Sequence, residues 1–80
     1  MVTASQIEEH FEVVGSDGHH VGKVDHVIGD NIELAKMDLA AGFKHHVIPL
    51  SWASRVEDKK VVLSLTADEA KSRWQEKKIS

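Results

Sequence analysis

The stretch DGHHVGKVDHVI, residues 17–28, decides the fold of this 80-residue chain. Its Asp-Gly start is typical of a tight turn, because Asp hydrogen-bonds its own backbone and Gly accepts a positive φ. The residues that follow predict a strand over 21–28. Its valines, at positions 21, 24 and 27, break the strict alternation of a β-strand. A bulge or sharp bend near Gly22 would return them to one face.

Short strands and turns continue on both sides of this stretch. The Gly-Asp-Asn segment at 29–31 predicts a turn, and the alternation of apolar and polar residues after it is typical of a half-buried strand. Residues 37–44 show no periodicity and are expected to form a loop. Pro49 marks a strand end or edge, because proline cannot donate to a ladder. A hairpin turn is expected at 58–60. About six short strands follow from these patterns, at residues 12–15, 21–28, 32–36, 45–50, 54–57 and 61–65.

A short helix is expected at each end of the chain. Near the N-terminus two overlapping capping boxes predict a short helix or single turn that ends near His10. These boxes are Thr3 with Gln6, and Ser5 with Glu8. Thr66 and Glu69 form a third box, which opens a helix over about 67–77 with Trp74 on its apolar stripe. Charges suit the helix dipole, with Asp68 and Glu69 in the first turn and Lys77 and Lys78 in the last.

These elements predict a mainly β fold, a small, strongly bent sheet or barrel of about six strands with two terminal helices. The length allows one domain, residues 1–80, with the barrel at about 12–65. A domain this small has a thin core, and without cysteine no disulfide can reinforce it. A partner subunit is the remaining common way to add buried area, so we expect a homodimer.

Composition and charge narrow the class of partner and compartment. The net charge is −3, whereas nucleic-acid binders more often carry a basic surplus, so nucleic acid is not the expected partner. Residues 1–35 hold one lysine and seven acids, and residues 36–80 hold nine bases and six acids. No apolar run is long enough to cross a membrane. The first six residues do not resemble a secretory signal, and the absence of cysteine fits the cytoplasm.

Histidine is the one residue type in clear excess, with six in the chain. Histidine is the commonest metal ligand and titrates near neutrality. The candidate metal ligands are His19, His20, His26, His45 and His46. One set would join a histidine of 19–20, one of 45–46, and either Asp17 or His26. Adjacent strand residues point to opposite faces, so 45 and 46 do not readily share one ion. The alternatives are exposed polar residues without a ligand, or a pH-sensitive surface.

Motifs of catalysis are absent from the sequence. It contains no G-x-S-x-G elbow, no G-x-G-x-x-G and no P-loop spacing. We therefore assign no catalytic residue, no cofactor-binding residue and no cofactor, and expect a protein that is not an enzyme. The two tryptophans, Trp52 and Trp74, are the interface candidates, because tryptophan both fills cores and anchors interfaces. A basic C-terminal helix could touch RNA or an acidic partner.

Residues 17–27 resemble the opening signature of PRC-barrel domains, an acidic-glycine turn followed by a hydrophobe-glycine pair and spaced valines. Residues 46–52 and 58–63 are similar to the second half of that family, where an Ile-Pro-Leu segment precedes a hairpin. More narrowly, the chain resembles DUF2171, a group of small bacterial proteins of unknown function. The resemblance covers about residues 12–65, and in the narrower group the terminal segments as well. It implies a small barrel that binds another macromolecule or itself, and it supplies no catalytic residues.

The leading hypothesis is a non-enzymatic interaction or assembly module that self-associates and docks a further protein. One alternative is a small histidine-rich protein that binds a metal or an anion. A second is a factor associated with RNA or the ribosome, as in the PRC-barrel of a ribosome-maturation factor.

Overall fold

The structure, a computed structural model, describes residues 2–35 and 46–76. Its elements confirm a mainly β protein with one α-helix, and the predicted loop at 37–44 lies outside the described residues. The strands are β1 (Glu12–Val14), β2 (His20–Ile28), β3 (Asn31–Leu34), β4 (His46–Pro49), β5 (Ala53–Glu57), β6 (Lys60–Leu63) and β7 (Gln75–Glu76). Two 3₁₀ turns, Ala4–Gln6 and Leu50–Trp52, and the helix α1, Ala67–Arg73, complete the described chain.

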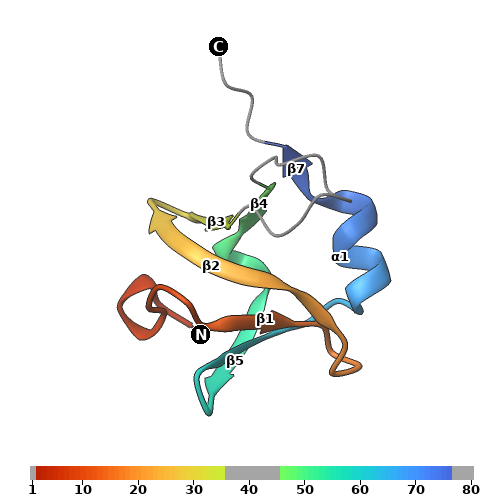
Figure 1. Cartoon of the computed structure of the whole chain (residues 1–80), viewed down its shortest axis with the longest axis horizontal. Coiled ribbons are helices and arrows are strands. Elements are labelled where there is room, and N and C mark those ends of the chain that lie inside the picture. Colours follow the sequence, from red (N-terminus) through yellow and green to blue (C-terminus); the bar gives the residue numbers. More distant parts are fainter. Residues whose placement is uncertain (1, 36–45, 77–80) are drawn as a thin grey trace.

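The strands form one bent sheet in the order β5-β6-β1-β2-β3-β4-β7. Among the strands of the described residues, only β1 and β6 run parallel to each other. The long, curved β2 crosses the molecule in the middle of this order, and its start pairs with β1 while its end pairs with β3 (Figure 1). We call β5, β6, β1 and the start of β2 the first half-sheet, and the end of β2 with β3, β4 and β7 the second half-sheet. Within the described residues β5 and β7 are edge strands, so the sheet is bent but does not close into a barrel. The resemblance to PRC-barrel domains is therefore not confirmed.

Two bulges give β2 its shape. Val13 pairs with Gly22 and Val14 pairs with His20, so Val21 is an extra residue beside Gly22, where the sequence predicted a bulge. A second shift between Val24 and His26 makes Asp25 the extra residue against β3. The bulges allow valines spaced by three to be buried, with Val21 and Val24 4% and 1% exposed.

Turn residues match the predicted hairpins. Asp58 and Lys59 both have positive φ, 50° and 61°, as the two central residues of a type I′ turn do. The residues on either side, Glu57 and Lys60, form the pair that closes the β5–β6 hairpin. The β2–β3 hairpin has an equally short turn at 29–30, closed by the pair of Ile28 and Asn31.

The helix α1 begins as the sequence predicts and ends earlier. The Thr66 hydroxyl accepts from the Glu69 N–H at 3.2 Å, and the Thr66 N–H donates to Glu69 Oε1 at 3.1 Å. The prediction that the helix continues to residue 77 is wrong, because Trp74 is extended, with ψ 158°. The next two residues, Gln75–Glu76, instead pair with β4. At the N-terminus the turn uses the Thr3 and Gln6 box, with Thr3 N–H donating to Gln6 Oε1 at 2.8 Å, and it is shorter than expected.

The core lies inside the bend of the sheet and is covered at one end by α1. Its largest fully buried side chains are Val13, Val24, Ile32, Leu34, Ile48, Val61 and Leu63. Gly15 lies where the β1–β2 turn meets the start of the helix, and a Cβ there would collide with the backbone nitrogen of Ala67. The turn and the helix are joined further by Ser16 N–H, which donates to Leu65 O at 2.7 Å.

The strand β3 corrects one expectation from the sequence. Alternation predicts a half-buried strand, but Ile32, Glu33 and Leu34 are all buried, at 0%, 3% and 1% exposure. Ile32 and Leu34 face the core, whereas Glu33 belongs to the opposite face. Its partners across the strands are His26 of β2 and Val47 of β4, and sequence alternation does not report the burial of this second face.

Candidate functional site

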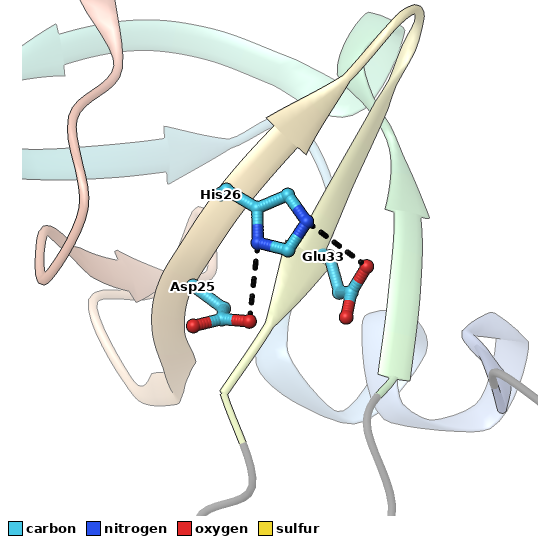
Figure 2. A group of neighbouring side chains, drawn as sticks. All are labelled: Asp25, His26 and Glu33. Atoms are coloured by element: carbon cyan, nitrogen blue, oxygen red, sulfur yellow. Dashed lines mark hydrogen bonds and ion pairs between the residues drawn. The ribbon is translucent and has the colours of Figure 1, made fainter. Parts of the chain in front are cut away.

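Three side chains on the second half-sheet form the candidate site: Asp25, His26 and Glu33 (Figure 2). Asp25 and His26 are neighbours on β2, and Glu33 lies on β3. In a regular strand adjacent side chains point to opposite faces, which would separate the first two. The bulge at Asp25 sets both residues against the single residue Glu33. The bulge is therefore the local feature that builds the site.

The His26 ring lies between the two carboxylates. Its Nδ1 is 3.1 Å from Asp25 Oδ2, and its Nε2 is 3.5 Å from Glu33 Oε2 (Figure 2). One donor atom from each of the three residues can be chosen so that all lie within 4.8 Å of one another. Each ring nitrogen thus faces a different carboxylate, which is an arrangement suited to holding a proton or a cation.

Burial is uneven across the site. The Glu33 side chain is 5% exposed, while those of His26 and Asp25 are 45% and 41% exposed. Glu33 therefore forms the floor of the site, and His26 and Asp25 are the side chains that meet solvent. The site is open on one side and closed on the other.

Apolar residues share the face that carries the site, because residues opposite each other and two apart lie on one side of a sheet. His26, Glu33 and Val47 form one row across β2, β3 and β4. Ile28, Asn31 and Pro49 form the next row. Ile28 is 50% exposed, the exposed large hydrophobic residue in the described part of the chain. The polar cluster thus sits beside an apolar strip on the same face.

The structure places the other predicted metal ligands that it describes outside this cluster, and each has a different partner. His19 Nδ1 lies 3.2 Å from Asp17 Oδ2, and His20 Nδ1 lies 2.9 Å from Glu12 Oε2. His46 is buried and stacks on Trp74, with ring centroids 3.9 Å apart and planes 15° apart. His45 lies outside the described residues. Among residues 2–35 and 46–76, Asp25, His26 and Glu33 are the one group of three potential ligands, and His26 alone was predicted.

The two carboxylates beside the β1–β2 hairpin histidines have lowered pKa values. The hydrogen bond to His20 is the main cause that lowers the pKa of Glu12. Partial burial raises the pKa of Asp17, but N–H donors from His19 and Ala67 outweigh it, and the net shift is downward. These histidines therefore act within the β1–β2 turn and its junction with the helix.

Sequence reasoning missed Asp25 and Glu33, although a signal for them exists. A two-residue turn at 29–30 sets the hairpin register, so residue 26 faces residue 33. In that register the Asp25–His26 pair lies beside Glu33, which is seven residues after His26. What the sequence did not reveal is the bulge that turns Asp25 to the same side.

The interface candidates Trp52 and Trp74 are both half-buried and pack against the core. Trp52 lies directly before β5, and its carbonyl accepts from the Ser64 N–H at 2.9 Å. Trp74 ends α1 and contacts His46. Both side chains retain some exposed area.

These features define a small, open β-sheet protein with one helix and one mixed histidine–carboxylate cluster. The chain belongs to DUF2171, a family described as uncharacterized proteins conserved in bacteria, whose model matches residues 7–71. Searches of curated proteins and of solved structures each returned no significant match. None of the helices in the described residues has the length and apolar character needed to span a membrane.

Proposed function

We propose that the protein is a non-enzymatic, cytoplasmic interaction module that forms a homodimer through the edge strand β5. The observation that carries the proposal is the charge pattern along this strand. Arg55 and Glu57 flank Val56, and their side chains are 61% and 56% exposed. An edge strand offers unpaired backbone groups to another strand, and this one also offers both signs of charge.

The pattern is complementary to itself. In an antiparallel pair with Val56 opposite Val56 of a second copy, each Arg55 lies opposite the other copy's Glu57. Directly opposite charges of unlike sign contribute about 0.2–1 kcal/mol per pair, while like charges repel. In each single chain Arg55 Nε is 3.0 Å from Glu57 Oε1, so pairing exchanges the two intrachain ion pairs of the two copies for two ion pairs between them. The resulting two-fold contact is the commonest symmetry of soluble oligomers.

Other features support a dimer at this edge. The extra residue Ser54 limits the regular ladder to Arg55–Glu57, which favours a short closed pairing over open-ended stacking. Trp52 lies at the start of the strand and offers apolar area to the seam. The stacking of Trp74 on His46 favours a packing role for that residue. The absence of cysteine fits a reducing compartment.

The test is sedimentation velocity on the untagged protein from micromolar to millimolar concentration. We expect a dimer whose dissociation constant rises at least severalfold in Arg55→Glu and in Glu57→Arg, because each places like charges opposite each other. The double variant Arg55→Glu/Glu57→Arg restores unlike pairs and should restore the dimer. Arg73→Glu on α1, a matched charge change elsewhere, should leave it unchanged. A monomer at millimolar concentration, or a double variant no better than the single ones, would overturn the proposal.

A further inference from the structure

We propose that Asp25, His26 and Glu33 form a binding site for one divalent transition-metal ion, for which zinc is the probe. His26 Nε2 and Glu33 Oε2 are the ligands, and Asp25 is a positioning residue that orients the imidazole. The proposal rests on the second half-sheet and is independent of pairing at β5.

The hydrogen-bonding capacity of histidine is the first argument. A neutral imidazole has one N–H donor and one acceptor nitrogen. If Nδ1 donates to Asp25 at 3.1 Å, the lone pair of Nε2 faces a carboxylate oxygen of Glu33 at 3.5 Å. In that tautomer a cation between Nε2 and the Glu33 carboxylate, either a proton or a metal ion, would join the two groups.

The distance between Nε2 and the Glu33 carboxylate leaves room for a metal ion. N–H···O hydrogen bonds are most often about 2.9–3.0 Å long. Zinc binds histidine nitrogen and carboxylate oxygen at about 2.0–2.2 Å, so two ligands of a tetrahedral ion lie roughly 3.4 Å apart. The observed separation of Nε2 and Oε2, 3.5 Å, is that of an ion pair and also fits the separation of two ligands on one ion.

The role of Asp25 follows from its contact with the other ring nitrogen. Histidines that ligate metals commonly donate their second N–H to a carboxylate, which fixes the tautomer and the ring orientation. Asp25 Oδ2 occupies that place against Nδ1. Because the bulge holds Asp25 on this side of the sheet, the orientation is built into the strand.

The surroundings of the site suit a bound cation with open positions. Glu33, 5% exposed, supplies a carboxylate that faces Nε2 from the protein side, while His26 opens toward solvent. Waters would complete the coordination sphere on that side. Exposed charges in general contribute little, whereas a carboxylate this well shielded from water interacts more strongly with a charge placed beside it.

The other histidine–carboxylate pairs lack these properties and serve as controls. His19 is 79% exposed and His20 is 42% exposed, and each faces a single carboxylate through Nδ1. Neither belongs to a group of three donors among the described residues. Incidental capture of zinc by exposed histidines would depend on these residues as much as on His26.

Isothermal titration calorimetry of the untagged full chain with zinc chloride tests the proposal. We expect one ion per chain, with binding lost in His26→Gln and weakened at least tenfold in Glu33→Gln. Asp25→Asn should weaken binding by roughly 10–100-fold, as loss of a positioning carboxylate does. His19→Gln and His20→Gln should bind as the unaltered protein does. Absence of one-to-one binding, or equal losses in the control variants, would overturn the site.

Two further measurements keep the test decisive. Glu33 is buried, so circular dichroism must show that Glu33→Gln is folded; if it is not, the exposed positions His26 and Asp25 decide. Arg55→Glu, which targets the proposed dimer, should bind zinc unchanged. Loss of zinc binding with an intact dimer, or of the dimer with intact zinc binding, would separate this inference from the proposed function.

Discussion

The two half-sheets share β2 but differ in what they bury. In the first half-sheet the buried residues of the strands are apolar or glycine, and valines predominate. In the second half-sheet two polar residues, Glu33 and His46, are buried beside Ile32 and Ile48. Buried polar groups are expensive unless they are partnered, whereas apolar burial stabilises directly. The comparison teaches that both halves bury apolar side chains, while the second half also buries polar ones.

The largest expected effect tests the stabilising role of the first half-sheet. Leu63→Ala removes a side chain that is 1% exposed, and such truncations lower the free energy of unfolding by about 2–5 kcal/mol. Ile28→Ala removes a residue of similar size that is 50% exposed in the second half-sheet, so the loss should be within about 0.5 kcal/mol. Urea unfolding measures both. Similar losses in the two variants would contradict the buried position of Leu63 and the exposed position of Ile28.

The next effect concerns the junction between the first half-sheet and the helix. In Gly15→Ala the new methyl would collide with the Ala67 nitrogen and lie 2.7 Å from the carbonyl carbon of Thr66. Because both obstacles are backbone, we expect a loss of about 1–3 kcal/mol or more, as overpacking produces. Thermal unfolding followed by circular dichroism gives the result. An unchanged midpoint would show that the β1–β2 turn does not rest on α1.

A smaller change in stability is expected at the candidate site. Glu33→Gln keeps the size of the side chain and a hydrogen-bonding oxygen but removes the charge that faces His26, so the free energy of unfolding should fall by about 0.5–1.5 kcal/mol. Zinc binding, in contrast, should fall sharply. Urea unfolding in the presence of a chelator measures the free energy of unfolding without bound metal. A loss as large as that of Leu63→Ala would make Glu33 a structural residue instead.

The smallest effect is the response to acid. The pKa values of Glu12, Asp17 and Glu69 are lower in the folded chain than their ordinary values. A lowered pKa adds stability above the pKa of the unfolded chain, near 4, and this stability is lost as pH falls through the folded values. Stability measured by urea should therefore decline from about pH 5 downward, and less steeply in Glu12→Gln. A flat profile, or one that rises toward acid, would contradict the assigned hydrogen bonds.

Local patterns predicted much of the fold. The bulge beside Gly22, the hairpin at 58–59 and the Thr66 capping box each depend on a few neighbouring residues, and the structure confirms them. The end of α1 was placed wrongly because Gln75–Glu76 pairs with β4, a contact with a segment far away in sequence. No local propensity reports such a partner.

The candidate site was predicted less well than the fold. His26 was identified by residue type alone, while Asp25 and Glu33 required the register of the β2–β3 hairpin and a bulge within β2. Glu33 was expected on a half-exposed strand because alternation shows two faces and does not show what flanks each one. Histidine frequency drew attention to positions 19, 20, 45 and 46. The register of the strands identifies the candidate site better than the number of histidines in the sequence does.

A zinc titration followed by ¹H–¹⁵N correlation spectra of the untagged protein tests the central claim most directly. The account predicts that chemical shifts change first and most at residues 25, 26 and 33 and at their neighbours on β2 and β3. Amides of the first half-sheet, including those near His19 and His20, should stay in place until zinc exceeds one ion per chain. Changes centred on those two histidines, or no saturable change at all, would contradict the assignment of chemistry to the second half-sheet.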